Sequence, residues 1–162
     1  MAPADEFDEL MGTLDYPMVV ATVTAGGRSD GCLVGFTTQC SIDPPLLAVC
    51  LSDKNRTTGT ARAADALGLH LLAPEHRPLA ELFGGRTGDD VDKFAEVRWA
   101  PGPLGVPLLT RIDRWVVGRI TDRIRWGDHV AHLLEVVEVS KGRPRPILSF
   151  QAVKDIPAGH EA

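Results

Sequence analysis

Apolar residues in this chain gather in short, dense runs, and runs of this length predict buried strands rather than long helices. Four such runs lie in the first half of the chain: Val19–Ala25, Cys32–Thr38, Leu46–Ser52 and Leu67–Leu72. The polar residues 26–31 between the first two runs predict a hairpin turn. Apolar and polar residues then alternate over Gly118–Trp126, and this period of two predicts a half-exposed antiparallel strand. The Gly-Asp pair at 127–128 predicts a tight turn, and further strands are expected at His129–Val139 and Pro146–Val153.

Helical patterns occupy less of the chain. Apolar residues recur at helical spacing within Ala4–Leu14, which predicts a short amphipathic helix. Further helices are expected at Thr57–Ala66 and at Pro74–Phe83, the latter closed by two glycines. Residues 86–107 predict a loop with one helical turn at Asp89–Phe94. Because short turns join most strands, we expect a mainly β fold, a closed or split antiparallel barrel with inserted helices, since closure removes exposed strand edges.

The composition is that of an ordinary globular protein, and it narrows the function classes. The chain has 162 residues, 44% of them hydrophobic and 24% charged, and we expect a single domain over residues 1–162. Its formal net charge of −5 argues against a nucleic-acid-binding protein, which needs a basic face. No apolar run reaches the roughly 20 residues of a membrane span, and the acidic N-terminal segment lacks the pattern of a signal peptide. We therefore expect a cytoplasmic protein that binds neither nucleic acid nor membrane.

The common nucleotide-binding and hydrolytic motifs are missing from this sequence, among them GxGxxG, GxxxxGK[ST], GxSxG and HExxH. His129 and His132 are three residues apart on a predicted strand, so their side chains point to opposite faces and we expect no metal site. Cys32, Cys40 and Cys50 form no CxxC pair, and three thiols cannot all pair within one chain. Their small or apolar surroundings predict buried, reduced thiols.

One segment, Gly35–Thr57, concentrates the polar chemistry. Hydroxyl and amide side chains cluster just before a rigid Pro-Pro corner: Thr37, Thr38, Gln39 and Ser41. One strand later, Lys54 and Arg56 lie where a helix is expected to start, and free backbone N–H groups and the helix dipole favour an anion there. This arrangement predicts a phosphate site in an acidic protein. The alternative is an ordinary helix cap at Asn55 or Thr57 with solvated basic side chains.

These motifs resemble, in order, those of the flavin reductase-like family of FMN-binding split barrels. Ser41-Ile42-Asp43-Pro44-Pro45 is similar to the family's S-x-D-P-P motif, and Lys54-Asn55-Arg56-Thr57 is similar to the turn that follows its next strand. Further matching motifs follow in the family's order: Pro17-Met18-Val19-Val20, Leu79–Phe83, Asp92-Lys93-Phe94 with Trp99, Pro107-Leu108-Leu109 and Gly127-Asp128-His129. The resemblance covers residues 15–155 and implies an antiparallel split barrel of the Greek-key type.

The resemblance implies that the chain binds FMN, or alternatively FAD, and reduces it with NADH or NADPH as co-substrate. The residues that it assigns to the flavin ring and ribityl chain are Gly35, Phe36, Thr37, Thr38, Gln39, Cys40 and Ser41. Those that it assigns to the phosphate turn are Ser52, Lys54, Asn55, Arg56 and Thr57. His129 matches a histidine near the flavin and nicotinamide, where it would orient the nicotinamide or supply a proton. The alternative is a turn histidine bonded to the backbone.

The chain also departs from the family pattern. Where the family often has two serines, this chain has Gly35 and Phe36, so fewer hydroxyl groups would contact the flavin, and Phe36 could instead belong to the core. No residue near Cys40 in the sequence marks a partner base, so we expect no catalytic role for its thiol. The resemblance further implies a homodimer that completes the flavin site across its interface, and a monooxygenase partner that uses the reduced flavin.

Three other functions stay open at the level of sequence. The same residues could serve an FMN-binding redox carrier or sensor without reductase turnover. A related split barrel could use a deazaflavin, or haem with His129 or His132 as its axial ligand. The barrel could also be structural and bind no cofactor.

Overall fold

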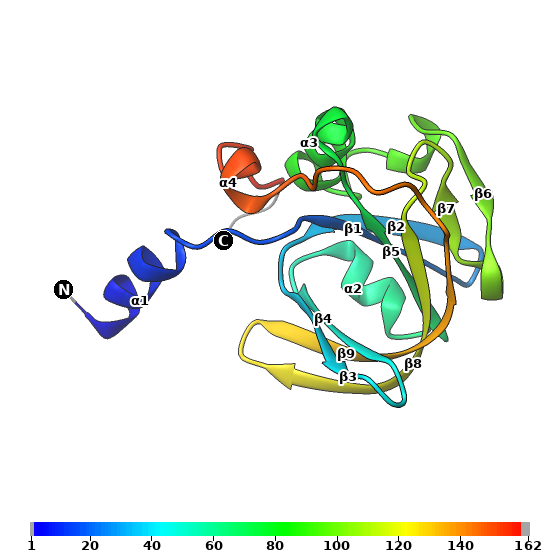
Figure 1. Cartoon of the computed structure of the whole chain (residues 1–162), viewed down its shortest axis with the longest axis horizontal. Helices are drawn as coiled ribbons and strands as arrows, with labels where there is room; N and C mark the ends of the chain where they lie inside the picture. Colours follow the sequence, from blue (N-terminus) through cyan, green and yellow to red (C-terminus); the bar gives the residue numbers. More distant parts are fainter. Residues whose placement is uncertain (1, 160–162) are drawn as a thin grey trace.

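The computed structural model describes residues 2–159, and its centre is a seven-stranded sheet in which all neighbouring strands are antiparallel. The strand order is β2-β1-β5-β8-β9-β4-β3 (Figure 1). The bounds of these strands are β1 (Val19–Ala25), β2 (Arg28–Val34), β3 (Thr37–Ser41), β4 (Leu46–Ser52), β5 (Ala66–Leu71), β8 (Trp115–Trp126) and β9 (His129–Val139). A separate antiparallel pair joins β6 (Trp99–Pro101) to β7 (Pro107–Leu109). The fold is therefore mainly β, as predicted.

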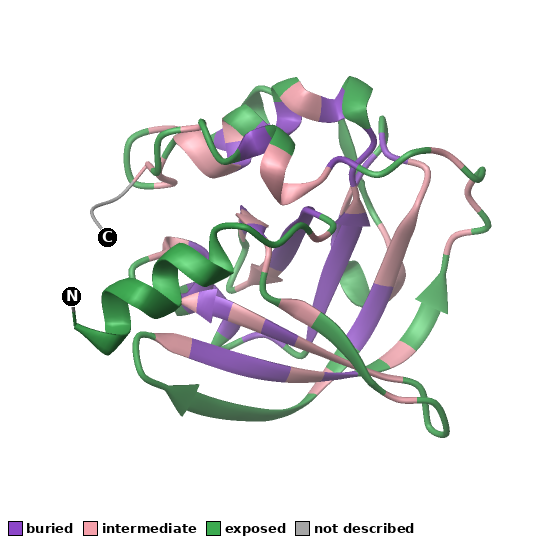
Figure 2. Cartoon of the chain, turned by 60° about the vertical axis from the view of Figure 1, so that its left-hand side comes forward, coloured by how far each residue is buried: buried purple, intermediate pink, exposed green. Residues whose placement is uncertain are grey.

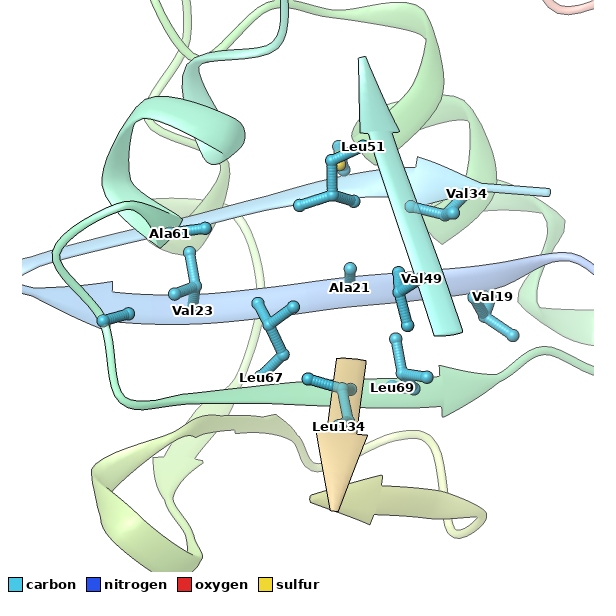
Figure 3. Close-up of a cluster of buried hydrophobic side chains, with 12 residues drawn as sticks. Val19, Ala21, Val23, Val34, Val49, Leu51, Ala61, Leu67, Leu69 and Leu134 are labelled. Atoms are coloured by element: carbon cyan, nitrogen blue, oxygen red, sulfur yellow. The ribbon is translucent and has the colours of Figure 1, made fainter. Parts of the chain in front are cut away.

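The large sheet curls so that strands near its two ends share one core. Val49 and Leu51 of β4 belong to the same buried cluster as Val34 of β2, although β2 and β4 are not neighbours in the sheet (Figure 3). Helix α2 (Arg56–Ala61) adds Ala61 to this cluster from inside the curl. The two ends of the sheet thus meet through apolar side chains rather than through backbone hydrogen bonds.

Two helices cover the face of β1 and β2 that points away from this first cluster (Figure 1). Helix α3 (Arg77–Gly85) and helix α4 (Phe150–Val153) contribute Phe83 and other residues to a second buried cluster, which includes Val20. Because successive side chains of a strand point to opposite faces, Val20 enters this cluster while its neighbours enter the first. Residues 19–23 are consequently buried without interruption.

A buried histidine links three strands of this region. His70 of β5 has no exposed surface, and its Nε2 accepts a hydrogen bond of 3.0 Å from the backbone N–H of Leu109 in β7. Its Nδ1 lies 3.2 Å from the carbonyl oxygen of Val20 in β1, so a neutral ring with the proton on Nδ1 satisfies both contacts. Burial lowers the pKa of His70 to about 4, which keeps the ring neutral at neutral pH.

The outer face of the sheet at the end of β8 is exposed to solvent. Ile124 and Trp126 of β8 are exposed by 45% and 62%. The arginines that alternate with them bind the rest of the chain: Arg123 donates to the carbonyl oxygens of Ala61 and Ala64, and Arg125 pairs with an aspartate at 2.6 Å. The alternation predicted over Gly118–Trp126 is wrong in its second half, because a bulge between Ile120 and Asp122 shifts the register. Ile120 packs against the first core cluster, whereas residues 121–126 are all exposed. The apolar side chains of Ile124 and Trp126 therefore have no cover within residues 2–159.

Helix α1 (Pro3–Met11) projects from the body, and none of its residues is buried (Figures 1 and 2). The apolar side chains of this helix and of the segment after it are open to solvent: Phe7, Leu10, Met11 and Leu14. The segment after the helix is nevertheless fixed, because Gln151 Nε2 donates hydrogen bonds of 2.8 and 2.7 Å to the carbonyl oxygens of Gly12 and Leu14. None of the helices in residues 2–159 is long and apolar enough to cross a membrane.

Several predictions of local structure are wrong. Residues 146–153 form no strand, because only Ser149 bridges to Pro17 before α4 begins. The helix predicted at Thr57–Ala66 ends at Ala61, because Ala66 already pairs with β8 as the first residue of β5. The loop predicted over residues 86–107 also contains a strand, β6, whose three exposed residues are too short a run to form a strand pattern.

The three cysteines differ in exposure. Cys32 is buried, as predicted, and burial raises the pKa of its thiol to about 11. Cys50 is half-buried, and partial burial raises the pKa of its thiol too. Cys40 is exposed, so the prediction of a buried thiol is wrong there. It lies on β3, which ends the sheet and therefore has only one neighbouring strand to cover it.

Candidate functional site

A hollow of about 380 Å³ opens between the β2–β3 connection, the end of β4 and the β8–β9 turn. Its lining is mainly apolar, and we call it the apolar hollow. Six residues that the sequence assigned to one site line it: Gly35, Phe36, Ser52, Lys54, Asn55 and His129. The fold therefore brings together residues from three separate segments of the chain.

Aromatic rings form the walls of the apolar hollow. Tyr16 stacks on Phe150 with ring centroids 4.8 Å apart and planes 8° from parallel. Phe36 lies against His129 with centroids 5.1 Å apart and a tilt of 40°. Because Phe36 is 56% exposed, the alternative that places it in the core is wrong. The hollow thus offers flat apolar surface to a ligand, which suits an aromatic ring system.

Gly35 leaves room for the stacked pair of rings. A Cβ atom at this position would lie 2.5 Å from Cε2 of Tyr16 and 3.3 Å from Sδ of Met18. The first distance is a clash, so any larger side chain would displace the Tyr16 ring. The glycine that departs from the family's serine pattern is therefore matched to the tyrosine beside it.

His129 is held by the residue that precedes it. Its Nδ1 lies 2.7 Å from Oδ1 of Asp128, an exposed carboxylate in the β8–β9 turn. This hydrogen bond and the charge of the ring hold the pKa of Asp128 below its usual range. The contact fixes one edge of the imidazole while the ring packs against Phe36, so the side chain is oriented at the rim of the apolar hollow.

A second hollow, of about 640 Å³, adjoins the first. Its lining includes four basic residues, and we call it the cationic hollow: Arg28, Lys54, Arg56 and Arg62. Lys54 and Asn55 line both hollows, so the two lie side by side at these residues. Asn55 precedes α2 without a side-chain capping bond, which leaves its amide available to a ligand. Among the described residues, Lys54 forms no ion pair with an acidic side chain.

Arg56 already has partners within the chain. Its Nε lies 3.2 Å from Oδ1 of Asp30, which is almost fully buried, and its Nη1 donates to the carbonyl oxygen of Gly88. The hydroxyl of Thr60 donates to the other oxygen of Asp30. The charge of Arg56 is therefore largely balanced, and Lys54 is the freer of the two cations that the sequence placed together.

The remaining predicted residues lie apart from the apolar hollow. Those of β3 form the edge strand of the sheet and do not line the hollow: Thr37, Thr38, Gln39, Cys40 and Ser41. Thr57 is buried inside α2. Ser52, by contrast, lines the apolar hollow, and its hydroxyl accepts a hydrogen bond of 3.3 Å from the backbone N–H of Lys54, which shapes the turn between the two hollows.

Sequence reasoning missed four residues of this region: Tyr16, Asp30, Arg28 and Phe150. Phe150 meets Tyr16 only after the chain has closed around the sheet, so no local pattern marks it. Asp30 was assigned to a turn, but it lies inside β2, where a carboxylate needs a buried partner. The charged position within a strand was the signal that could have found it.

His129 and His132 lie in different surroundings. His132 has no exposed surface, and neither of its ring nitrogens has a hydrogen-bond partner among the described residues. Burial lowers the pKa of His132. Within residues 2–159 no group of three His, Cys, Asp or Glu side chains could hold a metal ion. His132 does not line the apolar hollow, so a haem there would have to rely on His129.

Comparison with known proteins decides the family. A model of the flavin reductase-like domain matches residues 11–154. The chain belongs to this family. The mainly β architecture is that of the family's split barrels, which confirms the predicted fold class and the resemblance on which it rested.

Two flavin reductase-like relatives illustrate the similarity. The reductase subunit of a stachydrine N-demethylase from Rhizobium meliloti is 34% identical over 78% of this chain, which spans 56% of that relative's length. An FMN reductase (NADH) from Ancylobacter novellus is 30% identical over 98% of this chain and 91% of its own length. A crystal structure of a flavin reductase domain protein from an Arthrobacter species has the same fold, with a TM-score of 0.84 at 23% identity, over 92% of this chain and 91% of that one.

Proposed function

We propose that this chain is an NAD(P)H-dependent flavin oxidoreductase that transfers hydride from a nicotinamide to FMN or FAD. The observation that carries the proposal is the junction of the two hollows at Lys54 and Asn55, where an apolar aromatic cleft meets a cluster of cations. A flavin has the same division into an apolar ring system and an anionic phosphate. Membership of the flavin reductase-like family supports the same activity.

The residues of the two hollows fit a flavin. Phe36 and the Tyr16–Phe150 pair provide flat walls for the ring, and Gly35 keeps the space between them open. Lys54 provides an unpaired ammonium group for the phosphate. When bound, the flavin supplies the ring that accepts hydride from the nicotinamide. The chain itself contributes binding, orientation and exclusion of water.

His129 is the residue that we assign to the nicotinamide end of the site. It lies at the rim of the apolar hollow, and its bond to Asp128 holds the ring in one orientation. From this position it can donate a hydrogen bond that orients the nicotinamide over the flavin, or hold a proton near the ring. Because hydride transfer needs no other acid or base, we assign His129 chiefly a positioning role in the transfer.

A monooxygenase partner is supported by the relatives. A relative from Rhodococcus jostii, 31% identical over 75% of this chain and 64% of its own length, is named as the reductase subunit of a flavin-dependent monooxygenase. A reductase of this size that releases its reduced flavin would supply an oxygenase that has no nicotinamide site of its own. We therefore propose that the reduced flavin passes to an oxygenase.

We also propose a homodimer, because two apolar surfaces of the chain lack cover. One is the outer face of β8 with Ile124 and Trp126, beside a hollow of about 110 Å³ that Ala48 and Leu133 help to line. The other consists of the exposed apolar side chains of α1, which projects beyond the body (Figure 1). A second copy would bury both kinds of surface. Trp126→Glu should then convert a dimer to a monomer in sedimentation equilibrium, and a wild-type monomer would contradict the proposal.

Turnover is the test of the proposed activity. Purified protein, free FMN or FAD and NADH or NADPH are mixed, and the absorbance of the reduced nicotinamide is followed. We expect decay that needs both protein and flavin. Tight flavin binding without decay would instead identify a flavin-binding carrier or sensor, and the visible spectrum of the purified protein would reveal haem or a deazaflavin.

A further inference from the structure

A third hollow continues the path formed by the first two. It has a volume of about 670 Å³, larger than the apolar hollow, and we call it the distal hollow. Arg28, Arg56 and Asp89 line both the distal and the cationic hollows. The three hollows therefore follow one another, with the cations in the middle, and a ligand that ended at the phosphate would leave the distal hollow unused.

Aromatic rings form part of the distal hollow as they do of the apolar one. Phe94 and Trp99 line it, and Trp99 is 40% exposed, so part of the indole surface is open to a ligand. Carboxylates also line it, among them Asp90 and Asp92. Aromatic surface together with hydrogen-bond acceptors suits a purine base and the hydroxyl groups of its ribose.

The distal hollow is held in shape by contacts behind its lining. Trp99 meets Phe94 edge to face with centroids 5.8 Å apart, and Phe94 meets Phe83 in the same way at 5.8 Å. Lys93 is buried, and its Nζ donates hydrogen bonds of 3.2 and 3.0 Å to the carbonyl oxygens of Gly31 and Phe83. These contacts fix the segment before any ligand arrives, which lowers the entropic cost of binding.

The cations lie at both ends of the middle hollow. Lys54 lines its border with the apolar hollow, and Arg28 lines its border with the distal hollow. Neither forms an ion pair with another described residue, whereas Arg56, which lines the same border as Arg28, is balanced by Asp30. Two linked phosphates can each meet one of these cations, whereas the single phosphate of FMN next to Lys54 leaves Arg28 without a partner.

We propose that the distal hollow holds the adenosine half of FAD, so that this chain binds FAD in preference to FMN. The proposal rests on the proposed function, because it needs the flavin ring to occupy the apolar hollow. The diphosphate then crosses the cationic hollow between Lys54 and Arg28, and the adenine lies against Trp99. Trp99 is thereby a residue that determines which flavin is bound.

The first experiment compares the affinities of FAD and FMN for the wild-type protein and for Trp99→Ala, by isothermal titration calorimetry without nicotinamide. We expect FAD to bind the wild type at least about tenfold more tightly than FMN, the scale of one base stacked on an aromatic side chain. Trp99→Ala should remove most of that difference and leave FMN affinity unchanged. The matched variant Trp99→Phe should keep most of it, because an aromatic face remains.

A competition experiment adds an independent readout. AMP, which carries the adenosine half alone, should displace FAD from the wild type but should not displace FMN. Unchanged FMN affinity in Trp99→Ala and Trp99→Phe shows that the fold and the apolar hollow are intact in both variants.

Three results would overturn the proposal. Equal affinities for FMN and FAD in the wild type would do so while leaving flavin reductase activity in place. A variant Trp99→Ala with unchanged FAD affinity but a raised KM for NADH would assign the distal hollow to the nicotinamide cofactor instead. Failure of the wild type to bind either flavin would overturn the proposed function together with this inference.

Discussion

The apolar hollow and the cationic hollow share Lys54 and Asn55, yet the chain builds them in different ways. The apolar hollow joins distant segments, since Tyr16 and Phe150 stack only after the sheet has closed. The cationic hollow draws most of its residues from the short stretch 53–63. The aromatic surface that we assign to the flavin ring therefore depends on tertiary closure. The basic side chains that we assign to the phosphate come mostly from one local stretch, and the ion pair of Arg56 with Asp30 then modifies them.

The largest effect on flavin affinity is expected at the apolar hollow. In Gly35→Val the new side chain meets Tyr16, where a Cβ alone would approach within 2.5 Å of the ring, so the stack must shift into the space for the ligand. We expect FMN and FAD affinity each to fall by about 100-fold, which corresponds to about 2.7 kcal/mol of binding free energy. Isothermal titration calorimetry measures this.

Circular dichroism of Gly35→Val serves as its control and should show an unchanged strand content. If Gly35→Val bound flavin as the wild type does, the ring would not lie in the apolar hollow, and the division of roles between the two hollows would fail.

The next effect concerns stability rather than affinity. Asp30→Ala removes the carboxylate that pairs with Arg56 and accepts from Thr60, and it leaves a partly buried guanidinium without its counter-charge. We expect a loss of roughly 2–3 kcal/mol in the free energy of unfolding, since the pair is only partly shielded from solvent. Urea denaturation measures it. Thr60→Val, which removes one hydrogen bond but no charge, should cost less, and an equal or larger loss there would argue against the ion pair as the main contribution.

Substitutions of Lys54 and Arg56 should differ in their effect on stability, although the sequence assigns both residues to the same phosphate turn. Lys54→Ala should weaken FMN and FAD binding about tenfold, without loss of stability, because it removes one unpaired cation from the phosphate. The difference in flavin affinity between Lys54→Ala and the wild type should shrink at high salt, because salt screens the attraction between the ammonium group and the phosphate. Arg56→Ala should instead lower stability along with affinity, because it also releases Asp30 and the Gly88 carbonyl. Equal behaviour of the two variants in urea denaturation would remove the distinction.

The smallest effect on flavin affinity is expected at the rim. His129→Ala should slow the reduction of bound flavin by NADH a few-fold, while the flavin dissociation constant stays near that of the wild type, because the ring borders the hollow without supplying its flat walls. Stopped-flow absorbance measures the first quantity and calorimetry the second. Asp128→Asn weakens the hydrogen bond to Nδ1 but keeps the imidazole. Its rate of flavin reduction should lie between those of the wild type and His129→Ala. A proportional loss of binding and reduction would show that His129 acts on the flavin instead.

Sequence patterns predict a strand well where all of its residues lie in the same kind of environment. The dense apolar run of β1 is buried on both faces, as predicted, whereas a bulge between Ile120 and Asp122 interrupts the alternation predicted for β8 and leaves residues 121–126 exposed on both faces. The prediction failed at residues 146–153, where apolar residues cover a core from a connecting segment and then form α4. The hydrophobic pattern reports burial there, but it does not report which element supplies it.

For the site, the sequence located the residues whose neighbours lie nearby in the chain. Lys54, Asn55 and Arg56 adjoin the cationic hollow, and Phe36 adjoins the apolar one. The pairing of Arg56 with Asp30 was out of reach, because the two residues meet only when α2 packs on β2. The assignment of the β3 residues to the flavin stays a prediction, since they lie at a sheet edge outside the hollow.

We propose that one flavin spans the apolar and cationic hollows and is reduced there by a nicotinamide. The most direct measurement is the visible spectrum of the protein with stoichiometric flavin, recorded without oxygen before and after NADH or NADPH is added. The account predicts that the flavin absorbance bleaches as the nicotinamide is oxidised one for one, and that Gly35→Val abolishes this at the same concentrations. Flavin that stays bound and oxidised with both nicotinamides would contradict it.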